Sequence, residues 1–151
     1  MRPVTVRNIK IGEGRPKICV PIVEKEKEGI LAQASAIAGL PLDMAEWRAD
    51  WYEDVKDSGK VLDTVRELRK ARGEIPLLFT FRTAAEGGAA DMASGAYAKL
   101  CAAAARSGYA DLIDVEVFTA GESAQDIVRD VHLAGVKVVA SNHDFHKTPP
   151  K

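Results

Sequence analysis

The fold of this chain is decided by residues 76–118, which read PLLFTFRTAAEGGAADMASGAYAKLCAAAARSGYADLIDVEVF. The two ends of this segment, 76–82 and 111–118, are rich in β-branched and large apolar residues, as buried strands are. The alanine-rich stretch 92–106 between them carries its larger apolar residues at helical spacing. Two strands that flank such a helix run parallel, because parallel neighbours need a crossover connection. The segment therefore predicts a β-α-β unit.

The same alternation extends over most of the chain. It predicts further helices at 26–38, 58–72 and 123–134, and further strands at 17–23, 43–50 and 136–142. Ahead of them, residues 4–11 alternate apolar and polar side chains as a small β-hairpin does. The order βαβαβαβαβ predicts an α/β protein with a parallel sheet. We expect one domain over 1–151, with a hairpin cap over 1–16 and βα units 1 to 5 over 17–151.

Four glycines stand at the ends of the predicted helices, and each precedes a predicted strand by a few residues. They are Gly39, Gly73, Gly108 and Gly135. Glycine ends helices because it adopts positive φ without strain. We therefore expect all four to be helix caps of this kind.

Composition and charge exclude several classes of protein. With 151 residues, 46% hydrophobic and 28% charged, the chain has the profile of one soluble globular domain. A net charge of −1 gives no field that would gather nucleic acid or anionic lipid. No apolar run approaches the roughly 18 to 20 residues of a membrane span, and no secretory signal is visible, so we expect a cytoplasmic protein that binds neither nucleic acid nor membrane.

The two cysteines give no sign of a metal site. Cys19 and Cys101 lie in apolar surroundings, without the Cys or His spacing that zinc requires. We expect buried, reduced thiols in a cytosolic chain and no bound metal.

Ionisable side chains collect near the ends of four successive strands. Glu46, Arg48 and Asp50 share one face, as do Thr80 and Arg82, and Asp114 and Glu116, while His143 follows the last strand. For a single strand, a solvated loop charge would explain such residues, but ligands of parallel α/β proteins bind at the carboxyl ends of the strands. The repetition therefore favours a site. Two arginines among carboxylates indicate a small anionic ligand that bears a carboxylate.

A histidine and a glutamate are placed to move a proton at this site. His143 is the one histidine that the strand pattern brings to the charged ends. Glu86 precedes Gly87 and Gly88, whose backbone freedom lets the loop turn back over the strand ends. We expect Glu86 to hydrogen-bond the imidazole and fix its tautomer.

Four segments together resemble the type I 3-dehydroquinate dehydratase family. They are EWRAD at 46–50, LLFTFRTAAEGG at 77–88, DLIDVE at 111–116 and SNHDFHKTP at 141–149. The resemblance covers essentially the whole chain, which corresponds to the N-terminal portion of the family. It implies an incomplete (β/α)8 barrel, a lyase of the shikimate pathway that converts 3-dehydroquinate to 3-dehydroshikimate through a lysine Schiff base, and no cofactor.

The resemblance also implies roles for individual residues. His143 would be the general base and acid, and Glu86 would orient and polarise it. Glu46, Arg48 and Arg82 would hold the substrate. Asp114 would support His143 from behind.

The family's Schiff-base lysine belongs to a sixth strand, which lies beyond Lys151. We therefore expect a truncated enzyme whose isolated chain is inactive. The open edges of the first and fifth strands lead us to expect a homo-oligomer, a dimer. Two other functions stay open: a non-catalytic half-barrel that binds small carboxylates or self-assembles, and, less favoured by the matched segments, a Schiff-base aldolase.

Overall fold

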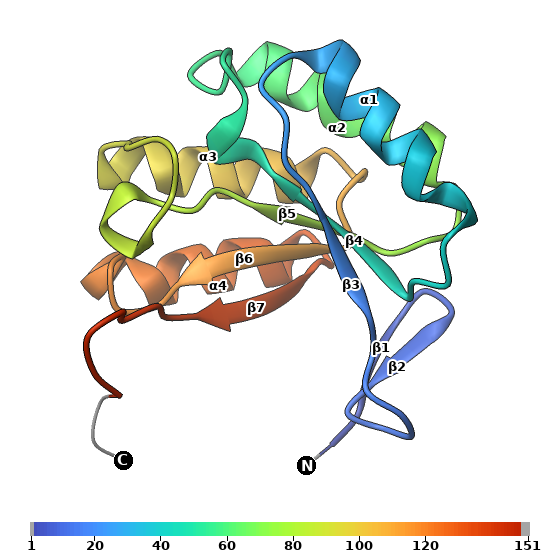
Figure 1. Ribbon diagram of the computed structural model, residues 1–151. Coiled ribbons are helices and arrows are strands. Elements are labelled where there is room, and N and C mark those ends of the chain that lie inside the picture. The colour runs from blue at the N-terminus through green and yellow to red at the C-terminus, as the bar shows by residue number, and fades with distance from the viewer. Residues whose placement is uncertain (1, 149–151) are drawn as a thin grey trace.

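The computed structural model describes residues 2–148, which form one parallel sheet, four α-helices and a separate hairpin (Figure 1). The sheet has the order β3-β4-β5-β6-β7, which is also the order of the chain, and every neighbouring pair is parallel. The strands are β3 (Cys19–Ile22), β4 (Met44–Arg48), β5 (Leu77–Thr80), β6 (Leu112–Glu116) and β7 (Lys137–Ser141). The helices are α1 (Lys27–Ala36), α2 (Ser58–Arg72), α3 (Ser94–Arg106) and α4 (Ala124–Leu133). The predicted α/β fold with five parallel strands is confirmed.

The main core lies between the sheet and the helices. Trp47 and Phe79, on neighbouring strands, are fully buried and meet edge to face with ring centroids 5.6 Å apart. They pack with helix residues that the apolar pattern had placed inward, among them Val65 and Leu68 of α2. Each helix contacts the next along the chain, so the four form a continuous outer layer. None of the described helices has the length and apolar character needed to cross a membrane.

The helix ends follow the expected signals at all but one position. Asp57 caps α2 by accepting hydrogen bonds from the backbone N–H groups of Gly59 and Lys60. Gly73, Gly108 and Gly135 adopt positive φ, as predicted. The prediction for Gly39 is wrong: it closes the 3₁₀ helix η1 (Ile37–Gly39), which continues α1 without a left-handed residue.

The hairpin closes the end of the sheet opposite to the charged strand ends. Its strands β1 (Val4–Val6) and β2 (Ile9–Ile11) pair antiparallel, which confirms the predicted hairpin. A second, smaller core joins it to the inner face of the sheet; its buried members are Val6, Met44, Leu78 and Leu112. This apolar floor separates the amino ends of the strands from solvent.

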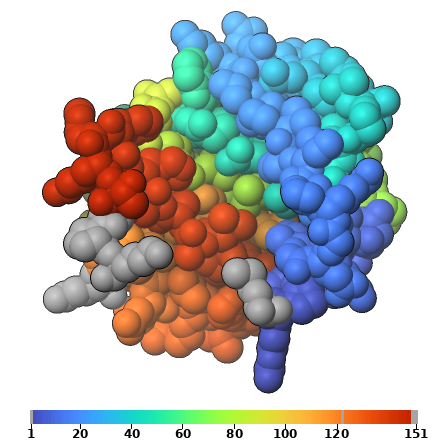
Figure 2. Space-filling view, turned by 60° about the horizontal axis from the view of Figure 1, so that its bottom comes forward, coloured from blue at the N-terminus to red at the C-terminus, as the bar shows by residue number. Residues whose placement is uncertain are grey.

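The inner face is open on both sides, because β3 and β7 are the edge strands. Figure 2 shows the blue N-terminal and the red C-terminal segments on opposite sides of one face, with green residues of the middle strands between them.

The prediction that both thiols are buried is wrong for one of them. Cys101 is buried, whereas Cys19 is exposed because it lies on an edge strand.

An ion-pair cluster fastens the hairpin to the sheet. Arg7, in the turn of the hairpin, donates from Nε to Asp111 Oδ1 at 2.6 Å. The second carboxylate oxygen of Asp111 accepts from Arg69 of α2 and from the backbone N–H of Leu77, the latter at 2.8 Å. One half-buried carboxylate thus joins the hairpin, a helix and two strands.

We expect Asp111→Ala to lower the free energy of unfolding by about 2 to 3 kcal/mol, because it removes one ion pair from each of two guanidinium groups and leaves the Leu77 N–H without its acceptor. Urea denaturation followed by circular dichroism measures this. Asp126→Ala is the control, since the Asp126–Arg129 pair is exposed on both sides; it should change stability by no more than about 0.5 kcal/mol. Equal effects of the two substitutions would contradict the fastening role.

Candidate functional site

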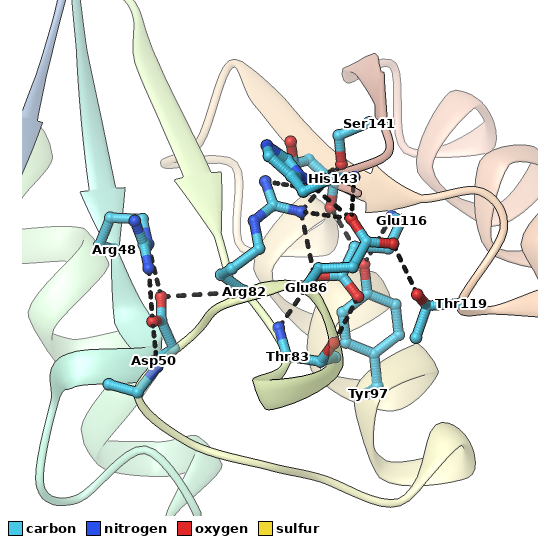
Figure 3. A network of polar contacts seen from close by, with 12 residues as sticks. Arg48, Asp50, Arg82, Thr83, Glu86, Tyr97, Glu116, Thr119, Ser141 and His143 are labelled. Atoms are coloured by element: carbon cyan, nitrogen blue, oxygen red, sulfur yellow. Dashed lines mark hydrogen bonds and ion pairs between the residues drawn. The ribbon is translucent and has the colours of Figure 1, made fainter. Parts of the chain in front are cut away.

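The charged residues meet at the carboxyl ends of β4 to β7, as the strand periodicity predicted (Figure 3). Successive strands contribute inward-facing residues to one network, because each strand is parallel to the next and in register with it. Its members are Arg48, Asp50, Arg82, Thr83, Glu86, Tyr97, Asp114, Glu116, Thr119, Ser141 and His143.

Arg82 is the centre of this network. Its guanidinium lies 3.0 Å from Asp114 Oδ1, 3.0 Å from Glu116 Oε1 and 3.5 Å from Glu86 Oε2. It also donates to Ser141 Oγ at 3.0 Å. The residue is only 6% exposed. Burial by itself lowers the pKa of a guanidinium, but Asp114 and Glu116 outweigh it and raise the pKa of Arg82.

Glu116 anchors the loop that follows β5. It is fully buried and accepts hydrogen bonds from the backbone N–H and the hydroxyl of Thr83, both at 2.8 Å. The Tyr97 hydroxyl of α3 accepts from the Glu116 backbone N–H at 3.1 Å and donates to the Asp114 carbonyl at 3.4 Å. Glu116 therefore acts inside the protein, with no face turned to a ligand. Nothing in the sequence pattern distinguished Tyr97 from an ordinary core residue of α3.

Arg48 and Asp50 form a second ion pair at the end of β4. The two carboxylate oxygens of Asp50 accept from Arg48 Nε and Nη2, each at 2.8 Å. Asp50 also accepts from the backbone N–H groups of Arg82 and Ala89, at 3.3 Å and 3.0 Å. Burial opposes ionisation, but these bonds outweigh it and lower the pKa of Asp50. Asp50 lies in the 3₁₀ helix η2 (Ala49–Trp51) rather than in the strand, and still faces Arg48.

The expected hydrogen bond between Glu86 and His143 is present. Glu86 ends the 3₁₀ helix η3 (Ala84–Glu86), and Gly87 follows with a φ of +84°, which turns the loop back over the sheet. Its Oε2 lies 2.9 Å from His143 Nδ1 and 2.9 Å from the His143 backbone N. Thr119 donates to the other oxygen, Oε1, at 2.6 Å. Burial opposes ionisation, but the bonds from Thr119 and His143 outweigh it and lower the pKa of Glu86.

This geometry decides how the imidazole is protonated. An ionised carboxylate can only accept, so Nδ1 of His143 carries the proton that it shares with Glu86. Nε2 is then the basic nitrogen, and the side chain of His143 is 42% exposed. The pair is therefore arranged to take a proton from a molecule on the solvent side of the strand ends.

Asp114 and Glu46 complete the inner face. Asp114 accepts from Ser141 Oγ at 2.8 Å and pairs with Arg82, so its link to His143 runs only through Arg82 and Glu86. Burial raises the pKa of Asp114, against the effect of Arg82. Glu46 is half-buried, and its carboxylate accepts no hydrogen bond from any group in residues 2–148. Its oxygens are open to a ligand.

The charges of the site do not balance. Two guanidinium groups stand among five carboxylates: Glu46, Asp50, Glu86, Asp114 and Glu116. Within the described part of the chain, every ion pair of a lysine lies elsewhere, on the helices or the hairpin side. These residues supply a proton-transfer pair and oxygen acceptors, and both arginines already bind protein carboxylates.

Comparison with known proteins gives consistent matches. A family model described as type I 3-dehydroquinase matches residues 18–151. The chain is 48% identical over 150 residues to a 3-dehydroquinate dehydratase of Clostridium botulinum (strain Eklund 17B / Type B). The aligned region covers 99% of this chain and 59% of the relative. For the enzyme of Clostridioides difficile (strain 630), the identity is 46% over 150 residues, with the same coverage.

Solved structures agree in fold. A type I 3-dehydroquinate dehydratase from Clostridium difficile superposes with a TM-score of 0.94 at 46% identity, over 98% of this chain and 58% of that one. A 3-dehydroquinate dehydratase from Enterococcus faecalis gives 0.92 at 43% identity, over 97% and 61%. The chain thus spans about 59% of the length of the curated relatives it matches.

The lowered pKa of Glu86 predicts a specific effect of acid on stability. The ionised carboxylate stabilises the fold above its ordinary pKa of 4.5, and this contribution is lost as the pH falls through the lower value in the folded chain. Glu86→Gln cannot titrate, so its stability should fall less steeply between about pH 5 and pH 3. Urea denaturation across this range measures the slope. Glu28→Gln, on an exposed part of α1, should keep the wild-type slope, and an unchanged slope in Glu86→Gln would contradict the assignment.

Proposed function

The chain belongs to the type I 3-dehydroquinase family, and from this premise we propose that its charged strand ends form the part of a 3-dehydroquinate dehydratase site that binds the substrate and moves its proton. The hydrogen-bonded pair of Glu86 and His143 is the observation that carries the proposal. It presents a basic nitrogen, backed by a buried carboxylate, above a polar inner face. Such a pair suits removal of a proton next to a carbonyl.

In the reaction of the whole family enzyme, which also needs the amine described below, 3-dehydroquinate loses water to give 3-dehydroshikimate. His143 Nε2 takes the C2 proton, and the electron pair of that C–H bond forms the new double bond as the hydroxyl leaves. The imidazolium then returns its proton to the departing hydroxyl, which is released as water. Glu86 keeps the proton on Nδ1 throughout and stabilises the imidazolium.

The remaining predicted residues would bind the substrate in different ways. Glu46 has free oxygens and would accept hydrogen bonds from hydroxyl groups of the substrate. Arg48 is the more open arginine, with a side chain 23% exposed, and would donate to the substrate while keeping its pair with Asp50. Arg82 is nearly enclosed by carboxylates, so it would act on the substrate through its positive charge more than through direct hydrogen bonds.

We propose that the 151-residue chain binds the ligand without turning it over. The family mechanism needs an amine that converts the ketone to an imine, because the imine withdraws electrons and acidifies the C2 proton. The described residues bring no lysine into the network, which supports this proposal. By the same family reasoning, we propose that the whole family enzyme acts in the shikimate pathway and in the cytoplasm. We also propose that residues 1–151 form a single domain.

Titration with quinate separates binding from catalysis. We expect heat of binding in calorimetry, no gain in the enone absorbance with 3-dehydroquinate, and no lysine adduct after borohydride reduction. Glu46→Ala should weaken quinate binding by about tenfold or more, since a charged hydrogen bond is worth about 1.5 to 3 kcal/mol. Glu53→Ala, outside the site, should bind as the wild type does.

Each outcome that differs from these expectations contradicts a different part of the proposal. Absence of heat at millimolar quinate would overturn the binding site itself. A rise in absorbance, or a reduced adduct on any lysine, would show that this chain supplies its own amine. Heat without turnover is also the outcome that the non-catalytic binding module predicts, and only the family membership then favours the enzyme.

We further propose that two copies of the chain associate. The edges of β3 and β7 are unpaired in the described sheet, and a largely apolar groove of about 720 Å³ lies along α4 and the turn that follows β6. Val117, Val128 and Leu133 line this groove, and Leu133 is 79% exposed. A second copy would cover this surface and remove it from water.

Sedimentation velocity at micromolar concentration should give a dimer for the wild type. Leu133→Glu should shift the distribution towards the monomer, because it places a charge in the covered groove. Leu40→Glu, at an exposed leucine away from α4, is the matched control and should remain dimeric. A strictly monomeric wild type would contradict the proposal.

A further inference from the structure

Thr119 makes the shortest hydrogen bond to the carboxylate of Glu86. It lies in the turn that follows β6, and its hydroxyl donates to Glu86 Oε1 at 2.6 Å. This length is within the range of charge-assisted O–H···O⁻ bonds. Thr119 thus connects the loop after β6 to the catalytic pair formed by the loops after β5 and β7 (Figure 3).

The two oxygens of Glu86 have separate partners. Oε2 accepts twice from His143, through Nδ1 and the backbone N–H, and lies 3.5 Å from Arg82 Nη1, whereas Oε1 accepts only from Thr119 among the described groups. Rotation of a carboxylate about its last bond has a broad, nearly two-fold profile, so the side chain does not choose its own plane. The hydrogen bonds at the two oxygens make that choice.

One side-chain contact joins the two loops beside the pair. The ring of Phe145, two residues after His143, lies directly on Gly87, the residue after Glu86. A Cβ at Gly87 would stand 2.6 Å from Phe145 Cζ, which shows how closely the two loops approach. This contact joins the loops and does not itself act on the Glu86 carboxylate.

The position of Thr119 is itself well defined. Its turn is closed by the bond from the Ala120 N–H to the Glu116 carbonyl, at 2.9 Å, and by that from Gly121 to Phe118, at 3.2 Å. Val117, two residues before Thr119, is bound to β7, since its N–H donates to the Ser141 carbonyl at 3.1 Å. A β-branched side chain on such a turn has few rotamers to lose.

We propose that Thr119 is a positioning residue that acts through Glu86 on His143, holding the carboxylate plane so that Oε2 faces the imidazole. The proposal rests on the proposed function for its meaning in catalysis. The positioning of Glu86 by Thr119 does not depend on turnover, because it concerns only hydrogen bonds of the ligand-free chain.

The test compares Thr119→Val with Thr119→Ser in the 151-residue chain. Valine keeps the shape and removes the donor, so the pKa of Glu86 should rise towards its ordinary value in carbon-13 NMR titration. The His143 Nδ1–H resonance should be lost to faster exchange with water. Serine restores the donor and should restore both signals.

Ser123→Ala is the matched control. Ser123 follows in the same loop and donates to the Ala120 carbonyl at 2.6 Å, without contact to Glu86. This variant should keep the wild-type Glu86 titration and the Nδ1–H resonance. If it behaves as Thr119→Val does, the effect belongs to the loop and the proposal is wrong.

Two further results would overturn the proposal. One is a folded Thr119→Val chain with unchanged Glu86 and His143 signals. The other is a folded Thr119→Ser chain that titrates as Thr119→Val does, because serine keeps the hydroxyl donor. Because neither readout uses substrate, failure of quinate binding would leave this test unaffected.

Discussion

The site depends on one buried cation. The guanidinium of Arg82 lies among the carboxylates of Glu86, in the loop after β5, and of Asp114 and Glu116, both on β6. A carboxylate that has no counter-charge either stays exposed to water or becomes protonated when it is buried. Arg82 therefore allows β6 and the loop after β5 to bring ionised groups together, and the Glu86–His143 pair is built on that arrangement.

The fold was largely predictable because its determinants are local. Apolar residues at helical spacing and short β-branched runs gave the elements, and the two-residue period of the strands placed Arg48, Arg82 and Glu116 on the inner face. The bond between Glu86 and His143 was also predicted, since Gly87 allows the turn that it needs. Resemblance to a known family added the reaction, which no periodicity can supply.

The sequence did not predict every side-chain contact of the site. Thr119 and Tyr97 have no distinguishing pattern, and their roles follow from three-dimensional proximity to Glu86 and Glu116. The pairing of each arginine with protein carboxylates was likewise invisible. The errors at Gly39 and Cys19 have simple causes: a 3₁₀ turn prolonged one helix, and an edge strand left an apolar-looking thiol exposed.

The order of the strands in space, which equals their order in the chain, has a consequence for how the molecule forms. Each strand pairs with the one made just before it, so every closure spans only one helix and two loops and has a low entropic cost. Units can be added one after another as the chain leaves the ribosome. Glu86 is then synthesised well before its partner His143, so the proton-transfer pair can form only after β7 has been added to the sheet.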